Sequence, residues 1–300
     1  MKTLLIALAF AGGLAAEQPF QVQVTGHGRP VILIPGFSCP GEVWDGTVAH
    51  YKDRYELHVI SLAGFAGLPR VPGPFLDSAR DGIAAYIRTH KLDRPIIVGH
   101  SLGGFLALDI AAHYPDLAGK LVIVDSYPML AGIMDPTMTT AKAKAAAAQM
   151  PQGMEQQSQD MFERTTKSGM YMRPMVTRDS DLDRLIAWGL KTDRSAATDA
   201  MSELFAGDLR ADLDKIKVPA LVMGTWIGYK EYGATHDTTG TNLRAQYAKL
   251  AGVQIEVTDT SRHFIMWDDP NWMFAKMDRF LEPVKLEPAK TEPAKTVSAK

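Results

Sequence analysis

A serine lies at the centre of the sequence Gly-His-Ser-Leu-Gly at residues 99–103. This Gly-x-Ser-x-Gly pattern is typical of a serine on a tight turn between a strand and a helix, where larger side chains would collide with backbone. Background usage gives roughly 0.1 chance matches in a chain of this size, so the context decides. The apolar run 96–98 predicts a buried strand before Ser101, and helix formers follow from Leu102. We therefore predict that Ser101 is a nucleophile rather than part of a helix-start turn without chemistry.

A second loop offers hydrogen-bond donors for the same reaction. The run 31–34 predicts a strand that stops at Pro35-Gly36, and Phe37 follows. The backbone N–H groups of Phe37 and Leu102 are the expected oxyanion hole. Each fixed N–H dipole would stabilise a tetrahedral oxyanion by about 3 kcal/mol. The alternative is an ordinary turn at the end of a strand.

His263 is the candidate general base. It follows the predicted strand 253–257 and precedes the last predicted helix, so its loop reaches the edge of the sheet where Ser101 lies. His100 is adjacent to the serine but points away from it by strand alternation, and we expect a structural role for it. His236, in a loop rich in glycine and threonine, is the alternative histidine for substrate contact.

These motifs together resemble the α/β-hydrolase superfamily. The resemblance rests on the Gly-His-Ser-Leu-Gly sequence and on the His-Phe-x-x-x-x-x-Pro segment at 263–270, and it covers residues 18–284 apart from an insertion. It implies a Ser-His-acid triad in that chain order, with a cap over the active site. The oxyanion loop of the family often begins His-Gly, whereas this chain has Pro35-Gly36. That difference changes how the loop is braced and leaves the same N–H available.

The acid of the implied triad is missing from its usual position. The family usually carries it after the strand that ends here at Met223, in a Gly-x-x-Asp arrangement, but this chain reads Gly-Thr-Trp-Ile. Some members place the acid after the preceding strand, where Asp125 fits. Its role would be to hold the tautomer of the imidazole and stabilise the imidazolium. A loop-capping carboxylate is the alternative for Asp125, and the other candidate acids are Glu231, Asp237 and Asp259.

The elements that must position these residues alternate between strand and helix. Strands are expected at 21–24, 31–34, 55–62, 96–98, 121–124, 220–223 and 253–257, and helices at 75–90, 102–114, 242–250 and 272–281. Two-sided apolar strands predict an α/β fold with a mostly parallel sheet and helices on both faces, in the α/β-hydrolase arrangement. The core is expected to comprise 17–127 and 209–284.

Residues 128–208 interrupt this alternation. They contain no strand pattern, are helical in pattern at 141–148, 181–190 and 196–205, and carry much Met and Gln. We predict a helical cap that provides an adaptable apolar pocket for an acyl or alcohol group. The candidate pocket residues are aromatic, with plain core packing as the alternative for each: Trp226, Tyr229 and Trp267.

Composition limits the partners. The chain has ordinary apolar and charged fractions and a net charge of −2, which predicts no nucleic-acid partner. Its one cysteine, Cys39, excludes an intramolecular disulfide and a cysteine metal cluster. We expect no metal ion and no organic cofactor, with a small molecule as the substrate. The oligomeric state does not follow from the sequence.

The two ends differ from the rest of the chain. Lys2, the apolar run 4–14 and the small residues before Glu17 predict a signal peptide at 1–16, with a buried N-terminal helix as the alternative. The run is too short to span a bilayer, so we expect an exported protein, periplasmic or secreted, without a membrane span after cleavage. Residues 285–300 repeat Glu-Pro-Ala-Lys and are expected to form a disordered tail.

The expected reaction is hydrolysis of a carboxylic ester by two-step acyl transfer. An amidase or peptidase, a cofactor-free perhydrolase and a C–C bond hydrolase are alternatives that would use the same triad. Haloalkane dehalogenation is disfavoured because that chemistry needs a carboxylate where this chain has Ser101. A non-catalytic binding protein that kept the fold is the alternative from another class.

Overall fold

A seven-stranded sheet forms the centre of the protein, in the order β1-β3-β2-β4-β5-β6-β7. The computed structural model describes residues 18–133, 135–151 and 157–282, so the expected signal peptide and tail lie outside the described residues. The strands are β1 (Phe20–Gly26), β2 (Arg29–Ile34), β3 (Tyr55–Leu62), β4 (Ile96–His100), β5 (Lys120–Val124), β6 (Ala220–Thr225) and β7 (Gln254–Thr258). β1 pairs antiparallel with β3 at the edge, and all other pairs are parallel. The predicted mostly parallel sheet is confirmed.

The register of the central strands brings their carboxyl ends together. His100 at the end of β4 pairs with Val124 at the end of β5. Val124 pairs in turn with Met223 on β6. The residues that directly follow β4 and β5 are Ser101 and Asp125, so both lie at the same edge of the sheet. Ligands of open parallel sheets bind at this edge.

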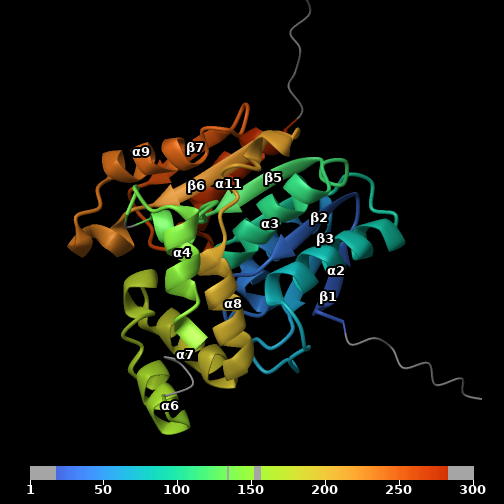
Figure 1. Cartoon of the computed structure of the whole chain (residues 1–300). Helices are drawn as coiled ribbons and strands as arrows, with labels where there is room; N and C mark the ends of the chain where they lie inside the picture. The colour runs from blue at the N-terminus through green and yellow to red at the C-terminus, as the bar shows by residue number, and fades with distance from the viewer. Residues whose placement is uncertain (1–17, 134, 152–156, 283–300) are drawn as a thin grey trace, which may run out of the picture.

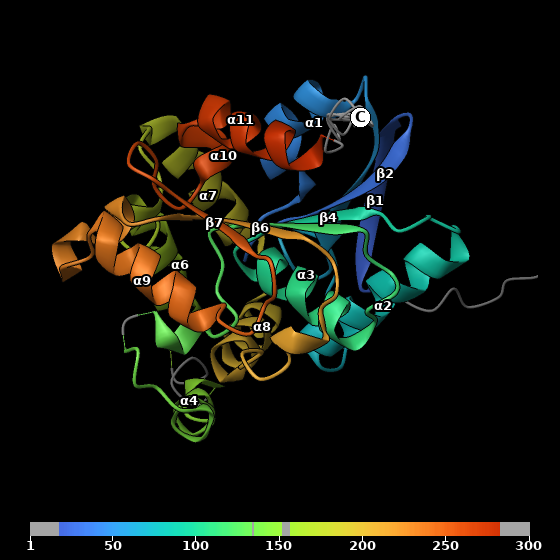
Figure 2. The same ribbon diagram turned by 90° about the horizontal axis from the view of Figure 1, so that it is seen from above.

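Helices cover both faces of the sheet (Figures 1 and 2). One face carries α2 (Phe75–Thr89), α3 (Leu102–His113) and α9 (His236–Gln246), and the other carries α1 (Asp45–Tyr51), α10 (Ile265–Asp268) and α11 (Pro270–Leu281). Each face has its own buried apolar cluster. The helix at 45–51 was not expected from the sequence, since it has seven residues and only Thr47 and Tyr51 are buried.

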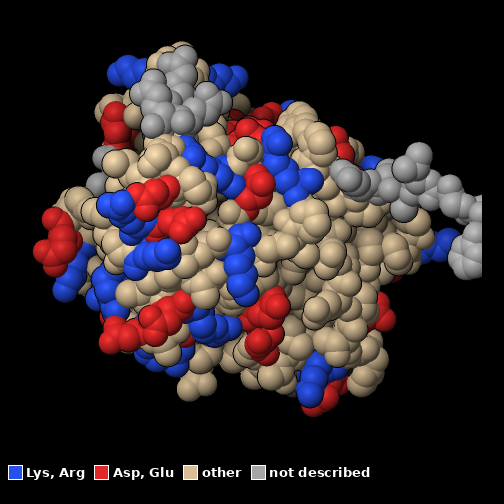
Figure 3. All heavy atoms as spheres, turned by 90° about the horizontal axis from the view of Figure 1, so that it is seen from below, with Lys and Arg blue, Asp and Glu red and all other residues tan. Residues whose placement is uncertain are grey.

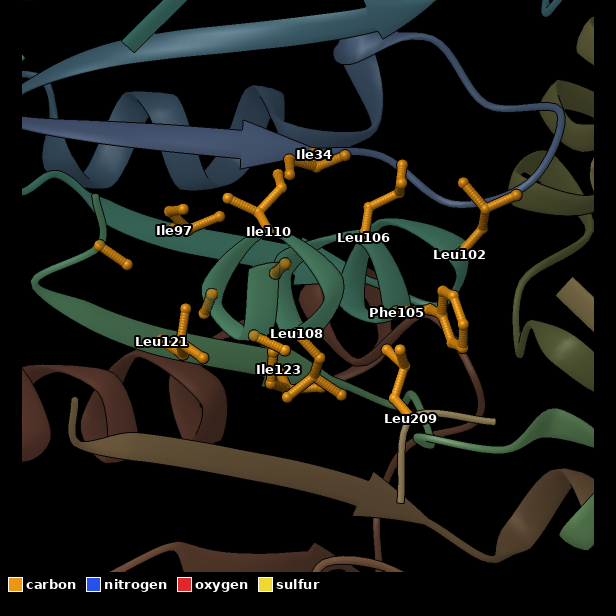
Figure 4. Packing of buried hydrophobic residues seen from close by; sticks show 14 of the residues in the cluster. Ile34, Ile97, Leu102, Phe105, Leu106, Leu108, Ile110, Leu121, Ile123 and Leu209 are labelled. Atoms are coloured by element: carbon orange, nitrogen blue, oxygen red, sulfur yellow. The ribbon is translucent and has the colours of Figure 1, made fainter. Parts of the chain in front are cut away.

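Helix α3 is buried along almost its whole length. Every residue from 102 to 112 is buried, which is expected of a helix that is apolar on all sides. Figure 4 shows Leu106 and Ile110 on the side of Ile34 and Ile97, with Leu108 beside Ile123. Packing on several sides holds the first turn of this helix in place. Ser101, the residue immediately before it, is therefore attached to a rigid element.

Between β5 and β6 the described residues are helical and include no strand. The helices are α4 (Thr140–Ala147), α6 (Gln159–Ser168), α7 (Asp179–Lys191) and α8 (Arg194–Ala206). They gather on one side of the molecule, at the lower left of Figure 1. We call residues 128–208 the cap segment. Helix α6 was not expected from the sequence, because its pattern is mostly polar.

The cap segment is bound to the core by hydrogen bonds at the start of α2. The carboxylate of Glu203, on α8, accepts the N–H of Phe75 at 2.8 Å and that of Leu76 at 2.7 Å. Both N–H groups belong to the first turn of α2 and have no acceptor within their own helix. Nearby, the Asp193 N–H donates to the Gly64 carbonyl at 2.7 Å. A cap helix thus completes the end of a core helix.

Helix α9 begins six residues before the predicted start. The sequence predicted 242–250, whereas the helix spans His236–Gln246. Thr235 caps it, since its side chain accepts the N–H of Thr238 while the Thr238 side chain accepts the N–H of Thr235. Such a reciprocal cap can start a helix in a segment without apolar periodicity.

Within the described residues, no helix is long and apolar enough to cross a membrane.

The charged side chains are mixed in sign on the surface that includes the cap segment. Figure 3 shows Lys and Arg interspersed with Asp and Glu on this face. Several form ion pairs along one helix, such as Lys167 with Glu163 at 3.2 Å. Exposed pairs of this kind contribute about 0.5 kcal/mol or less to stability.

Candidate active site

Ser101 occupies a strained turn between β4 and α3. Its φ of 54° and ψ of −120° lie outside the helical and strand regions, which is unfavourable for any residue with a side chain. Its N–H donates to the Val124 carbonyl at 3.0 Å, and its carbonyl accepts the Gly104 N–H at 2.9 Å. These bonds hold the residue in this conformation. The turn joins the carboxyl end of β4 directly to the first turn of α3, as the Gly-x-Ser-x-Gly pattern predicted.

The glycines on either side of Ser101 leave no room for side chains. A Cβ at Gly99 would collide with the carbonyl oxygen of Gly103, and a Cβ at Gly103 would collide with the carbonyl oxygens of Ile34 and Pro35. Because all of these contacts are with backbone, no side-chain movement could relieve them. The sequence predicted that side chains at these two positions would collide with backbone, and the structure confirms those collisions.

Asp125 and His263 form a close pair. Oδ2 of Asp125 lies 2.6 Å from Nδ1 of His263, and Oδ1 accepts the N–H of Thr225 at 3.1 Å. Asp125 is 6% exposed, so this carboxylate is held in a largely dry environment. In a neutral imidazole whose Nδ1 donates to this carboxylate, Nε2 is the nitrogen left to accept a proton. That is the tautomer that a general base needs.

The loop that carries His263 is anchored by buried side chains. Nε2 of His100 donates to the carbonyl of His263 at 3.0 Å. Burial, and then the proximity of His263, hold the pKa of His100 well below its usual value, so this ring stays neutral. Thr225 donates its hydroxyl to the carbonyl of Ser261. His100 thus acts on the position of His263, in line with the structural role expected for it.

The loop after β2 lies directly beside the serine. A Cβ at Gly36 would stand 3.2 Å from the Cβ of Ser101 and 2.8 Å from Nδ1 of His100. The N–H of Cys39 closes a turn onto the Gly36 carbonyl at 3.2 Å. Phe37 is carried by this turn, and Leu102 is fully buried at the start of α3. The two residues expected to form the oxyanion hole thus belong to segments next to Ser101, the loop after β2 and the first turn of α3.

A cavity of about 510 Å³ connects these residues with the cap segment. Ser101, Asp125, His263 and Phe37 all line it. Most of the remaining lining is apolar and comes from the cap segment, including Leu130, Ile133, Phe162, Met172, Met175, Leu185, Met201 and Leu204. The lining thus combines many apolar side chains with a serine, a histidine and a carboxylate.

The comparison with known families identifies the family of the chain. Residues 31–276 match the model of the alpha/beta hydrolase family. The chain belongs to the alpha/beta hydrolase family. As a family member it is a hydrolase, and the relatives below agree with this class.

Two relatives of this hydrolase carry names that specify a reaction. The chain is 26% identical over 215 residues to a pimeloyl-[acyl-carrier protein] methyl ester esterase of Nitrosomonas europaea, covering 67% of this chain and 78% of that one. It is 28% identical over 269 residues to an N-formylmaleamate deformylase of Pseudomonas putida, covering 86% and 90%. Among solved structures, the enol-lactonase of Burkholderia xenovorans LB400 has a TM-score of 0.69 at 16% identity, covering 87% and 96%. At that identity the likeness shows the fold alone.

The other candidate acids of this hydrolase lie elsewhere. Glu231 has 82% of its side chain exposed and lies 3.8 Å from Nζ of Lys230. Asp237 is also exposed, and Asp259 accepts the indole N–H of Trp226 at 2.8 Å. His263 pairs with none of these three carboxylates.

The three predicted pocket aromatics have different surroundings. Tyr229 lines the cavity, whereas Trp226 and Trp267 are absent from the lining that the described residues form. The indole of Trp226 is bound to Asp259, and Nε1 of Trp267 donates to the Val43 carbonyl at 3.0 Å. Trp267 packs against one of the buried apolar clusters, as the core alternative predicts, whereas Trp226 is half-buried and packs against neither cluster.

Sequence reasoning missed other cavity residues. Ser126 and Tyr127 follow Asp125 directly and line the cavity, as does Cys39. Burial raises the pKa of Cys39 to about 12, so its thiol is not a competing nucleophile near neutral pH. The signal that could have identified Ser126 and Tyr127 was their position just past the end of a central strand.

Among the described residues, no group of three or more His, Cys, Asp and Glu side chains could hold a metal ion.

Proposed function

We propose that this protein hydrolyses a carboxylic ester through Ser101, His263 and Asp125. The observation that carries the proposal is the 2.6 Å contact between Asp125 and His263, in the same cavity as the strained Ser101 turn. The serine hydroxyl attacks the ester carbonyl while Nε2 of His263 takes its proton. The proton then passes to the leaving alcohol, and an acyl-serine remains. Water, deprotonated by the same histidine, releases the acid and restores the serine.

Phe37, Leu102 and Asp125 are proposed to stabilise the charges that develop on the substrate and on His263 during the reaction. The backbone N–H groups of Phe37 and Leu102 are proposed to bind the oxyanion, which forms when the carbonyl becomes tetrahedral. Asp125 stabilises the imidazolium of His263 and keeps its proton on Nδ1. The apolar lining supplied by the cap segment favours an ester with an apolar acyl or alcohol group. The esterase names of several relatives support the choice of an ester.

Hydrolysis of a C–N bond is the second candidate function. It is favoured by one observation, the match to the N-formylmaleamate deformylase, which spans more of this chain than the esterase matches do. The same serine and histidine would serve, since the histidine can give its proton to a leaving amine. Turnover of an ester and of the amide with the same acyl group separates the two functions.

The test of the proposed function is a series of 4-nitrophenyl esters of increasing acyl length, with a serine-directed phosphonate as a probe. The wild type should hydrolyse these esters and be labelled by the phosphonate. Ser101→Ala should lose roughly 10⁶-fold in kcat and all labelling. Turnover or labelling that survives in Ser101→Ala would reject Ser101 as the nucleophile.

We also propose that residues 1–16 direct export, which rests on the sequence alone. Expression of the full chain in a two-membrane bacterium, followed by fractionation and N-terminal sequencing, tests it. The expected result is a periplasmic or secreted protein that begins near Glu17. A cytoplasmic protein that keeps Met1 and Lys2 would reject it.

A further inference from the structure

Tyr127 and Tyr229 reach the active-site cavity from two different strand ends. Tyr127 follows β5 two residues after Asp125, and Tyr229 lies in the turn Ile227–Tyr232 after β6. Both line the cavity that contains Ser101. Together with Ile133 they also line a neighbouring cavity of about 180 Å³. The two tyrosines therefore form part of the wall between the two spaces.

The hydroxyls of these two tyrosines have no hydrogen-bond partner among the described residues. The hydroxyl of Tyr247 donates to the Ser126 carbonyl at 3.0 Å and that of Tyr114 donates to Asp81 at 2.8 Å, whereas the buried hydroxyl of Tyr51, outside this cavity, also has no partner among these residues. Tyr127 as a whole is only 7% exposed, but its hydroxyl is not among the fully buried polar atoms without a partner, as expected of a residue that lines the cavity. A donor that faces a cavity and has no acceptor in the protein is satisfied by water or by a bound ligand. A bound substrate is the natural source of an acceptor in this cavity.

The electrostatic surroundings restrict which acceptor fits. Burial raises the pKa of both phenols, and the negative charge of Asp125 raises them further. Both groups therefore remain neutral donors throughout the pH range of an assay. The same charge of Asp125 repels an anionic group placed beside them, and apolar side chains around the cavity weaken the solvation of such a group. An uncharged oxygen of a substrate is not repelled by Asp125 and loses less solvation than an anion does.

We propose that Tyr127 and Tyr229 form a subsite that binds a second, uncharged acceptor oxygen of the substrate, remote from the carbonyl that Ser101 attacks. The inference rests on the proposed ester hydrolysis and specifies its substrate class: a neutral ester that carries a further ether, carbonyl or hydroxyl oxygen. That oxygen belongs either to the acyl group or to the alcohol. The two tyrosines are specificity-determining residues and take no part in proton transfer.

Pairs of substrates that differ by one oxygen in place of a methylene group test the proposal. The acyl pair is 4-nitrophenyl 4-methoxybutanoate with 4-nitrophenyl hexanoate. The alcohol pair is 2-methoxyethyl hexanoate with butyl hexanoate. For each pair, the ratio of the two kcat/KM values is compared between the wild type, Tyr127→Phe and Tyr229→Phe. Each substitution removes one oxygen from the protein and leaves the ring.

The expected result is a ratio, methoxy over methylene, that falls at least fivefold in one or both variants for one of the two pairs. A fivefold change corresponds to about 1 kcal/mol, at 1.4 kcal/mol for each factor of ten. The pair that responds identifies the side of the ester that carries the oxygen. The change should appear in KM, because the contact is remote from the reacting atoms and is made equally in ground and transition states.

Tyr247→Phe is the matched control, since Tyr247 is a nearby buried phenol that lines neither cavity. It should lower the melting temperature without changing either ratio. A charged probe, the mono-4-nitrophenyl ester of pentanedioic acid, should be hydrolysed at least tenfold more slowly than the methoxy ester. Preference for this carboxylate overturns the proposal.

Two further outcomes separate the inference from the function on which it rests. If the wild type hydrolyses these esters and neither tyrosine variant changes either ratio, the subsite is rejected and the proposed function stands. If the wild type hydrolyses no ester, both fall. Since a variant can lose structure for other reasons, only variants with wild-type circular dichroism are compared, and either tyrosine alone suffices for the test.

Discussion

Nδ1 of His263 lies 2.6 Å from Oδ2 of Asp125, although 138 residues separate them in the chain. The second oxygen of the carboxylate accepts the N–H of Thr225, at the end of the neighbouring strand. The carboxylate is thus fixed between its own strand end and the next one. This bond explains how a chain without a carboxylate in the usual position after β6 still supplies a partner for the histidine.

Replacement of the carboxylate by an amide tests the role proposed for Asp125. Asp125→Asn should lower kcat on 4-nitrophenyl esters by about 10⁴-fold, because an amide favours the wrong imidazole tautomer. Glu231→Gln is the matched control and should keep wild-type kcat, since its side chain is exposed beside Lys230. Equal activity of Asp125→Asn and the wild type would reject Asp125 as the acid.

The glycine at the start of α3 should tolerate no side chain. Gly103→Ala would drive a Cβ into the carbonyl oxygens of Ile34 and Pro35, so we expect a loss of about 3 kcal/mol in the free energy of unfolding. Gly46→Ala in α1 is the control, because nothing lies within 4 Å of its added Cβ, and it should be neutral or stabilising by up to about 1 kcal/mol. Urea denaturation measures both values. Similar stabilities for the two variants would show that the close approach at Gly103 is wrong.

Removal of the Glu203 carboxylate should weaken the attachment of the cap segment. Glu203→Ala leaves the N–H groups of Phe75 and Leu76 without their acceptor, at a cost of about 2 kcal/mol for charge-assisted bonds. Because the cap segment supplies much of the cavity lining, KM should rise more than kcat falls. Glu163→Ala, on the exposed face of α6, should change neither quantity. Hydrogen exchange at Phe75 and Leu76 provides a direct readout, and unchanged protection there would contradict the prediction.

Low pH should weaken the contact between α4 and the segment 208–210, because Asp208 accepts hydrogen bonds from Thr140 and Arg210 there. Hydrogen bonds from Arg210, and then from Thr140, lower the pKa of Asp208 from 3.8 to about 2. The folded state therefore binds this proton more weakly than the unfolded chain does. The stabilisation by the charged carboxylate is complete above about pH 4 and disappears as the pH falls towards 2.

Melting temperatures measured from pH 6 to pH 2 test this pH dependence. The wild type should be more stable than Asp208→Asn above pH 4, and the difference should shrink towards pH 2. Asp183→Asn, at an exposed position on α7, should run parallel to the wild type throughout. A constant difference between the wild type and Asp208→Asn across this range would contradict the assigned shift.

Much of the fold followed from local pattern. Strands at 55–62 and 121–124 and helices at 75–90 and 102–114 were found within two residues of their predicted bounds. These segments combine apolar runs with clear stops such as Pro115. By contrast, α6 and the first half of α9 are polar helices, and they depend on Ser158 and Thr235 as N-caps. Polar helices that begin at an N-cap cannot be predicted from apolar periodicity.

The candidate site divides in the same way. The amino-acid sequence by itself determined the turn at Ser101, because a strand, two glycines and a helix within eight residues restrict the backbone locally. It also limited the base to His263, on the loop before the last helix. Only the tertiary structure shows that His263 contacts Asp125 and not Glu231, and that Tyr229 rather than the two tryptophans lines the cavity. Those choices depend on which strand ends lie side by side, and that is set by pairing between strands about a hundred residues apart.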